Sequence, residues 1–207
     1  MLLFILTIIM LYIVIGNLLQ KKGNTFDIYF GVPGSGKTTF AAYLAKKRLK
    51  KDKKVYSNVS IKGTYEVCKQ DIGNYLIKDG LLLIDEAGVD YNNRKFKSFT
   101  DEEVYFFKHH RHYRVDIAIF SQGYDDMDLK LRTLATRLFI VKKSIFPGFI
   151  KRKLIQKRLG IDKQTKQIID QYSFAILGTK YIYCPKLWKM FNSYSTKELP
   201  IKDFPLY

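Results

Sequence analysis

The sequence predicts an α/β domain with a central, mostly parallel β-sheet, preceded by an N-terminal transmembrane helix. Three short apolar runs, at residues 26–31, 81–84 and 115–120, predict buried strands of that sheet. Continuous apolar runs of this length are typical of parallel strands that are buried on both faces. The amino terminus is a longer apolar run without a charged side chain, and it predicts the membrane helix.

The first 20 residues form the predicted membrane anchor. As a helix, residues 2–19 would be roughly 27 Å long, close to the thickness of a bilayer's hydrocarbon core. No basic residue precedes the run and no A-x-A-like site follows it, which argues against a cleaved signal peptide. The run has no polar stripe, which argues against a buried core helix. Lys21 and Lys22 follow directly, so the positive-inside rule places the rest of the chain in the cytoplasm.

Composition narrows the class of protein. Among 207 residues, 36 basic and 19 acidic side chains give a net charge of +17, which indicates an anionic partner, either nucleic acid or a phospholipid surface. A hydrophobic content of 47% excludes disorder of the whole chain. Two cysteines, Cys68 and Cys184, exclude a disulfide framework, and nothing near them has the spacing of a zinc site.

A phosphate-binding loop (P-loop) follows the first predicted strand. Residues 31–38 satisfy G-x-x-x-x-G-K-[ST] between a strand and a helix, a context that a chance glycine turn does not explain. Gly34 and Gly36 let backbone amides curl around phosphate oxygens. Lys37 would reach the β- and γ-phosphates, and Thr38 would complete the shell of Mg²⁺. The predicted ATP-binding residues are Gly31, Val32, Pro33, Gly34, Ser35, Gly36, Lys37, Thr38 and Thr39, the last touching the α-phosphate.

The second apolar run ends in two adjacent carboxylates, Asp85 and Glu86. At the end of a buried strand Asp85 would hold Mg²⁺, together with Thr38, while Glu86 would polarise the attacking water. Adjacent carboxylates are common in turns, but a position roughly 45 residues beyond a P-loop strengthens the assignment. A base beside the metal-binding aspartate indicates hydrolysis rather than the phosphoryl transfer to a second substrate that small kinases catalyse.

The third apolar run ends at Ser121 and Gln122. A polar side chain there can touch the γ-phosphate or orient the lytic water, and Gln122 is preferred over Ser121 for this role. The alternative is a strand that ends in an ordinary polar turn. The predicted catalytic set is Lys37, Glu86, Gln122 and Arg132.

A capping box at residues 100–103 predicts a helix that runs to about residue 113. His109, His110 and His112 lie on it, but only His109 and His112 share a face, and no nearby Cys or carboxylate completes a metal site. The histidines are therefore not assigned to a metal.

Four arginines compete for the role of an arginine finger, which offsets charge on the transferred phosphoryl group and often comes from a neighbouring subunit. They are Arg111, Arg114, Arg132 and Arg137, and none lies in or beside the P-loop. The sequence does not choose among them, and Arg111 and Arg114 could instead contact nucleic-acid phosphates. A finger supplied in trans predicts a homo-oligomer such as a ring, whose assembly a membrane anchor would favour.

These features together resemble one protein family. The resemblance is carried by the turn Asp85-Glu86-Ala87, by His110-Arg111-His112, by the strand ending Ser121-Gln122 and by Leu131-Arg132 before a final strand. On these residues, the part of the chain from 25 to 145 resembles the zonula occludens toxin-like (Zot) family, which includes gene I-type assembly ATPases of filamentous phages. The resemblance implies an ATPase in the host inner membrane that drives virion assembly and export, with phage coat proteins or a phage single-stranded DNA complex as partners. The family usually places the ATPase before its membrane span, and here that order is reversed.

The C-terminal residues 146–207 are predicted to form a basic extension with a β-hairpin. From 142 to 207 the chain carries 14 basic and 4 acidic side chains, densest at 151–158, which suits a membrane surface as well as DNA. Apolar runs at 174–177 and 181–184 predict the hairpin.

The predicted organisation is a transmembrane anchor (1–20), a P-loop ATPase core (21–145) and the basic extension (146–207). The first hypothesis is a motor ATPase for filamentous phage assembly and extrusion. Two alternatives remain open: a DNA-packaging or conjugative DNA-translocating ATPase, and a non-hydrolysing membrane scaffold switched by nucleotide.

Overall fold

The structure, a computed structural model, describes residues 23–91, 99–161, 168–175 and 178–191, together with positions 9 and 11. Apart from these two positions, the predicted transmembrane helix at 1–20 lies outside the described residues. Within the described part of the chain, no helix has the length and apolar character needed to span a bilayer.

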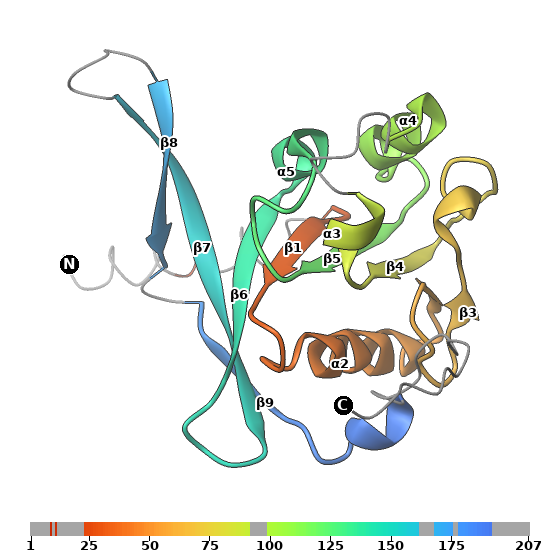
Figure 1. Cartoon of the computed structure of the whole chain (residues 1–207). Coiled ribbons are helices and arrows are strands. Elements are labelled where there is room, and N and C mark those ends of the chain that lie inside the picture. The colour runs from red at the N-terminus through yellow and green to blue at the C-terminus, as the bar shows by residue number, and fades with distance from the viewer. Residues whose placement is uncertain are drawn as a thin grey trace, which may run out of the picture.

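A single mixed sheet forms the centre of the molecule (Figure 1). Its strands are β1 (Phe26–Phe30), β2 (Lys54–Ser57), β3 (Tyr65–Glu66), β4 (Gly80–Ile84), β5 (Asp116–Ser121), β6 (Arg137–Lys143), β7 (Phe149–Ile161), β8 (Ile168–Phe174) and β9 (Lys180–Tyr183). They run in the order β3-β2-β4-β5-β1-β6-β7-β8, and β9 also pairs with β7. Every pair from β3 to β6 is parallel, which confirms the predicted α/β fold with a mostly parallel sheet.

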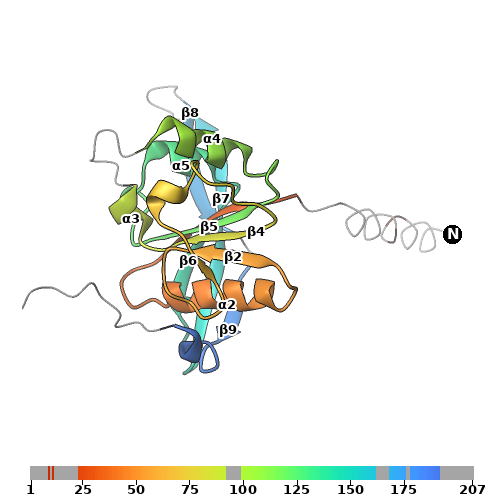
Figure 2. The same cartoon turned by 90° about the vertical axis from the view of Figure 1, so that its right-hand side faces the viewer.

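Helices cover both faces of this sheet, as the turned view in Figure 2 shows. They are α2 (Lys37–Leu49), α3 (Ala87–Asp90), α4 (Asp101–His109) and α5 (Leu129–Leu134), with single 3₁₀ turns at Lys69–Asp71 and Trp188–Met190. Helix α2 packs on one face, and α3, α4 and α5 pack on the other (Figures 1 and 2).

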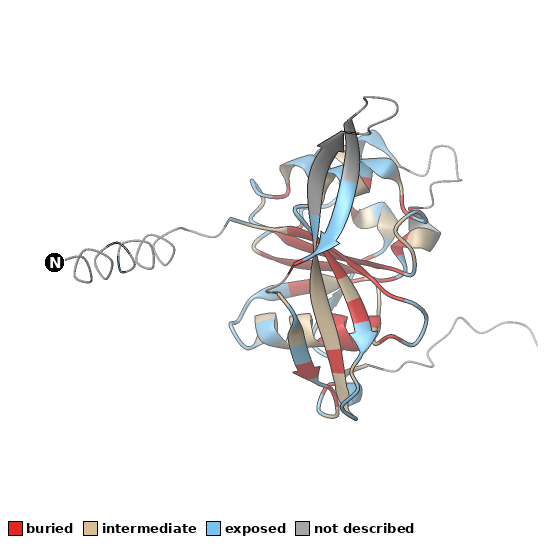
Figure 3. Cartoon of the chain, turned by 90° about the vertical axis from the view of Figure 1, so that its left-hand side faces the viewer, coloured by how far each residue is buried: buried red, intermediate tan, exposed pale blue. Residues whose placement is uncertain are grey.

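The core consists of two apolar layers, one on each face of the sheet. Side chains alternate along β1, so that Ile28 packs on the α4 side with Phe107 and Tyr29 packs on the α2 side with Phe40. Every residue of β1, β4 and β5 is buried, and Figure 3 shows these strands as the buried centre of the molecule. The predicted strands at 26–31, 81–84 and 115–120 are therefore confirmed, within one residue at each end.

The C-terminal strands extend the same sheet. The 13-residue β7 pairs antiparallel with β6 and β9 through its first half and with β8 through its second half. Residues 176 and 177 of the predicted hairpin lie outside the described residues. In the described part of the chain, β8 and β9 each pair with β7 rather than with each other, so the strands that flank this turn do not form the predicted hairpin. Strand β7 was not predicted, because the charge of the basic residues at 151–158 suggested a surface segment. Ile150 and Ile182 pack into the α2-side core, across the boundary predicted at residue 146.

Helix α4 begins as predicted and ends earlier. Thr100 Oγ1 accepts a hydrogen bond from Glu103 N at 3.2 Å, and a Glu103 carboxylate oxygen accepts one from Thr100 N at 2.9 Å, which confirms the capping box. The helix ends at His109 rather than near residue 113, because the chain turns at Arg114, which has a φ of 55°, to enter β5.

His110 is buried beneath the end of α4. Its Nδ1 lies 2.9 Å from the Phe107 carbonyl oxygen, and its ring meets Phe26 edge-on, with the ring centroids 5.8 Å apart. Burial, reinforced by the nearby charge of Arg111, lowers the pKa of His110 below its usual 6.5, although the Phe107 carbonyl and Asp116 oppose the change. No group of three or more potential metal ligands occurs among the residues that the structure describes.

We expect His110 to make the fold less stable in mild acid. The unfolded chain protonates this side chain as the pH falls through about 6.5, whereas the folded state resists protonation until a lower pH. The His110 contribution to the free energy of unfolding should therefore be fully present above pH 6.5 and should fall as the pH drops below 6.5. Denaturant unfolding at a series of pH values measures this, and His110→Gln should flatten the slope. The same substitution at half-buried His109 is the control, and an unchanged slope in His110→Gln would contradict the assignment.

Candidate functional site

The candidate site lies where the carboxyl ends of three neighbouring strands meet. Strand β5 runs between β1 and β4 and parallel to both, with Phe30 paired to Ser121 and Ile84 paired to Ile119. The P-loop follows β1 directly, and its first amide, Gly31 N, donates to the Ser121 carbonyl oxygen at 3.2 Å. Residues from three separate parts of the sequence are thereby brought to one edge of the sheet.

The glycines of the P-loop occupy positions where other residues would not fit. Gly34 and Gly36 have φ values of 72° and 97°, in the left-handed region that favours glycine. A Cβ atom on Gly36 would lie 2.6 Å from Ile150 Cγ2, and one on Gly31 would lie 2.5 Å from the Val141 carbonyl oxygen. The loop is therefore packed against β6 and β7 as well as curled on itself.

Lys37 is the first residue of α2, and its side chain reaches back to the P-loop. Its ammonium donates to the carbonyl oxygens of Gly31 and Val32, at 2.7 and 3.2 Å. Burial lowers the pKa of Lys37, while the negative charges of Asp85 and Glu86 oppose that change. The predicted cation and both predicted carboxylates therefore lie within electrostatic range of one another, as the sequence motifs require.

Thr38 and Asp85 form the contact expected of a magnesium site. Thr38 Oγ1 donates to Asp85 Oδ2 at 2.8 Å, although 47 positions separate the two residues in the sequence. Asp85 is 5% exposed, so its carboxylate is held in place rather than free in solvent. A hydroxyl and a carboxylate oxygen side by side are the hard donors that Mg²⁺ prefers.

Asn58 supports Asp85, a role that the sequence did not predict. Its side-chain amide donates to the Asp85 carbonyl oxygen at 2.9 Å and accepts from Asp85 N at 2.8 Å. Asn58 directly follows β2, which lies parallel to β4, so both residues reach the same edge of the sheet. A polar residue directly after a strand would have been the signal for this role. No strand was predicted before Asn58, because β2 is short and only half apolar.

Glu86 has an unusual backbone conformation for a residue with a side chain. Its φ of 54° and ψ of 40° are left-handed, which costs roughly 1–2 kcal/mol. Its amide donates to Asp85 Oδ1 at 3.0 Å, and α3 begins with the next residue. The side chain is exposed, so water can reach the carboxylate beside the buried Lys37 and Asp85.

The two polar residues at the end of β5 differ in their surroundings. Ser121 is fully buried, and its hydroxyl donates to the Gly123 carbonyl oxygen at 2.9 Å, which gives it a structural contact. Gln122 is exposed at the same edge as the P-loop. Its role as a γ-phosphate sensor stays a prediction.

The candidate finger arginines are mostly paired within their own chain. Arg114 binds Asp79, and Arg137 binds Asp27 through contacts of 2.5 and 2.8 Å. Both lie at the amino-terminal edge of the sheet, away from the P-loop. Arg132 binds Asp125 at 2.9 Å. The fourth candidate, Arg111, is exposed and has no ion pair within the described parts of the chain. The assignment of Arg132 to the catalytic set stays a prediction.

Known proteins resemble this chain in sequence and in fold. A family model described as Zonular occludens toxin (Zot) matches residues 61–198, which include Asp85, Glu86 and the end of β5. The crystal structure of the N-terminal domain of zonular occludens toxin from Neisseria meningitidis is similar with a TM-score of 0.56 and 19% sequence identity, covering 83% of this chain and 100% of that one. At this identity the likeness shows a shared fold.

A second solved structure is less similar. The genome packaging NTPase B204 from Sulfolobus turreted icosahedral virus 2, in complex with AMP, has a TM-score of 0.48 and 12% identity, covering 73% of this chain and 98% of that one. A search of curated protein sequences finds no match.

We expect Asn58→Ala to destabilise the fold by about 1–3 kcal/mol, because it leaves the largely buried Asp85 amide and carbonyl without partners. Asn74→Ala is the matched control, since Asn74 donates to the Gln70 carbonyl oxygen at an exposed site, and its effect should stay within about 0.5 kcal/mol. Equilibrium denaturant unfolding measures both variants. Equal effects of the two substitutions would show that Asn58 does not hold Asp85 in place.

Proposed function

The chain belongs to the zonular occludens toxin (Zot) family, and from this premise we propose that it is a membrane-anchored P-loop ATPase that drives the assembly and extrusion of a filamentous phage through the host membrane. The observation that carries the catalytic part of the proposal is the hydrogen bond from Thr38 to Asp85 beside the P-loop lysine. It joins the phosphate-binding loop to a carboxylate on a separate strand, as a magnesium-dependent nucleotide site needs.

The residues at this site fit ATP and Mg²⁺. The left-handed turns at Gly34 and Gly36 suit a loop whose amides surround phosphate oxygens. Thr38 and Asp85 offer adjacent oxygens for the metal. ATP supplies a γ-phosphoryl group that can be transferred to water, and Mg²⁺ offsets the charge on its oxygens.

Each residue of the chain has a distinct task in this proposal. Lys37 would exchange its contacts with two loop carbonyls for contacts with phosphate oxygens. Glu86 would accept a proton from the attacking water, which its exposed position allows. Gln122 would orient that water or contact the γ-phosphate from the end of β5.

The cellular part of the proposal rests on the sequence at the amino terminus. The uncharged run at 2–19 followed by Lys21 and Lys22 supports a single-pass anchor in the host inner membrane with the ATPase domain in the cytoplasm. The net charge of +17 supports anionic partners near the domain. We propose phage coat proteins or a phage single-stranded DNA complex as the material moved, and a homo-oligomeric ring as the active form.

We expect Glu86→Gln to separate binding from hydrolysis. The amide keeps the size of the side chain and loses its basicity, so turnover should fall by about 10²–10⁴-fold while ATP binding is retained. Lys37→Ala should lose both, because it removes the cation that contacts the phosphates. Steady-state hydrolysis and binding of a fluorescent ATP analogue to the purified full chain measure the two properties. Normal turnover in Glu86→Gln would exclude Glu86 as the base, and no hydrolysis in the wild type would favour a nucleotide-switched scaffold.

We further expect hydrolysis to need a subunit interface. A missing arginine finger typically lowers the rate by about 10³–10⁵-fold, so specific activity should rise as the detergent-solubilised protein is concentrated. Mixing Lys37→Ala subunits with Arg132→Ala subunits should restore activity, because each supplies what the other lacks. Mixing Lys37→Ala subunits with subunits that carry a substitution at another candidate arginine tests the remaining candidates, with Arg111→Ala, Arg114→Ala or Arg137→Ala in place of Arg132→Ala. Constant specific activity on dilution, with no complementing pair, would mean that the site is complete within one chain.

A further inference from the structure

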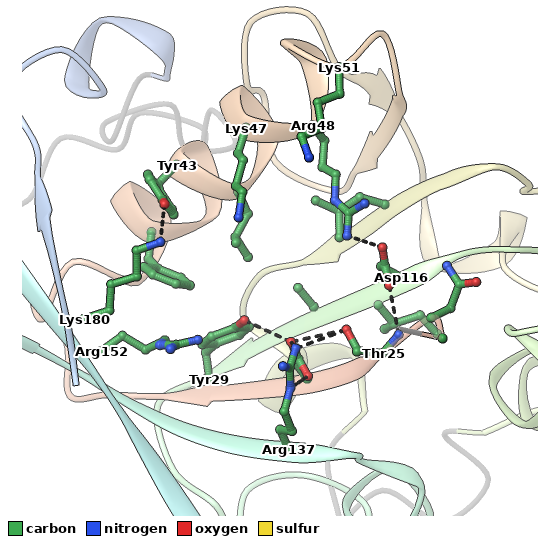
Figure 4. A pocket seen from close by; sticks show the side chains of 18 residues that line it. Thr25, Tyr29, Tyr43, Lys47, Arg48, Lys51, Asp116, Arg137, Arg152 and Lys180 are labelled. Carbon is green, nitrogen blue, oxygen red and sulfur yellow. Dashed lines mark hydrogen bonds and ion pairs between the residues drawn. The ribbon is translucent and has the colours of Figure 1, made fainter. Parts of the chain in front are cut away.

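A basic cavity lies at the amino-terminal ends of the parallel strands, and the P-loop lies at their carboxyl ends. Its volume is about 620 Å³, and it opens between the last turns of α2 and the first residues of β1, β5 and β6 (Figure 4). Strands β7 and β9 contribute Arg152 and Lys180 to its wall. The cavity has the size of a small-molecule site, and it shares none of the P-loop residues.

Positive charge dominates the lining of this cavity. Its basic side chains are Lys47, Arg48, Lys51, Arg137, Arg152 and Lys180, and its acidic side chains are Asp27 and Asp116. Both acidic groups are already engaged, since Arg48 binds Asp116 and Arg137 binds Asp27. Four positive charges are therefore left in excess around one concave space.

The excess cations lack carboxylate partners in the described parts of the chain. Lys180 Nζ donates to the Tyr43 hydroxyl at 2.5 Å, a neutral partner that leaves its charge uncompensated. Lys47 on α2 and Lys51 in the turn after it are exposed and line the cavity. Like charges held close together repel one another, so a bound anion would stabilise this arrangement.

Arg152 gives the clearest indication of a ligand. Its guanidinium packs over the Phe139 ring, 4.1 Å from the centroid, and its Nε is buried against that packing, with no hydrogen-bond partner among the described residues. In Figure 4 the side chain extends from β7 toward Tyr29 at the floor of the cavity. The planar guanidinium matches the paired oxygens of a phosphate group, and Arg152 lines the cavity without a carboxylate partner in the described parts of the chain.

The cavity also lies beside the point where the amino-terminal segment enters the domain. Gly23, Asn24 and Thr25 line its rim, and they directly follow the apolar run and Lys21-Lys22. The link from Leu19 to Gly23 can extend over about 14 Å at most. An anchored domain would therefore hold this cavity within reach of the lipid headgroups.

We propose that this cavity binds the phosphate headgroup of an anionic phospholipid. The inference rests on the membrane anchoring included in the proposed function, and it adds a specific lipid site to it. Basic pockets next to membrane segments bind such headgroups through their phosphates. A single-stranded nucleic acid would instead need an open groove with exposed aromatic platforms, whereas Tyr29 and Phe40 in this cavity are buried.

The test uses the full chain in neutral detergent micelles, titrated with phosphatidylglycerol or phosphatidylcholine and analysed by native mass spectrometry. The wild type should retain phosphatidylglycerol in preference to phosphatidylcholine. Lys47→Gln/Lys51→Gln should weaken retention about thirtyfold, since each lysine near a lipid surface contributes roughly 1 kcal/mol and about 1.4 kcal/mol corresponds to a factor of ten. The control Lys142→Gln/Lys143→Gln changes two exposed lysines on β6 outside the cavity, and it should bind as the wild type does. Arg152→Gln provides a second cavity variant, which removes one cation and should weaken retention about fivefold.

Four outcomes of this titration would overturn the proposal. They are equal retention of both lipids, equal losses in the cavity and control variants, displacement of phosphatidylglycerol by equimolar glycerol 1-phosphate or inorganic phosphate, and displacement by a thymidine oligonucleotide. The last two would identify a free phosphate compound or a nucleic acid as the ligand.

Two further measurements separate this inference from the proposed function. Lys37→Ala should lose hydrolysis and keep lipid retention, while Lys47→Gln/Lys51→Gln should keep hydrolysis and lose retention. Resistance to alkaline carbonate extraction tests the anchor itself, and it should be the same in the wild type and in both variants. Loss of lipid retention in Lys37→Ala would overturn the assignment of the lipid to this cavity.

Discussion

The parallel pairing of β5 with β1 on one side and with β4 on the other is the constraint on which the candidate site depends. Parallel strands end at the same edge of a sheet, so this pairing brings the P-loop, Asp85 and Gln122 together from three distant parts of the chain. The hydrogen bond from Thr38 to Asp85 then closes the gap across the intervening strand. A slip of one residue in either pairing would turn the buried side chains of β5 toward the opposite face and separate these groups.

Helix α2 connects the two edges of the sheet. It begins at the P-loop with Lys37 and Thr38, and its last turns line the basic cavity with Lys47 and Arg48. Strand β7 makes a second connection, because Ile150 packs against Gly36 while Arg152, two residues further on, lines the cavity. The two sites therefore share α2 and β7 although they share no residues. A movement of β7 relative to α2 would change the geometry of both sites.

The conformation of Glu86 shows how the fold stores strain at the site. A left-handed glutamate is unfavourable, and it persists because Asp85 on one side and the start of α3 on the other determine its backbone. The same turn leaves the Glu86 carboxylate exposed beside the buried charges of Lys37 and Asp85. Asn58 contributes from the neighbouring strand by holding the Asp85 backbone from both sides. The acidic pair is thus a positioned unit rather than two carboxylates in an ordinary turn.

The sequence by itself determined the P-loop, the central strands and the acidic pair, because each is a local pattern of a few adjacent residues whose physical reason is also local. Only the tertiary structure decided the pairing of β7, the support from Asn58, the ion pair of Arg137 with Asp27 and the existence of the basic cavity. These features join residues that are far apart in the chain, and side-chain chemistry alone does not specify which distant partner each residue meets. Strand register and helix packing make that choice, since they set which side chains share a face and which charges remain unpaired.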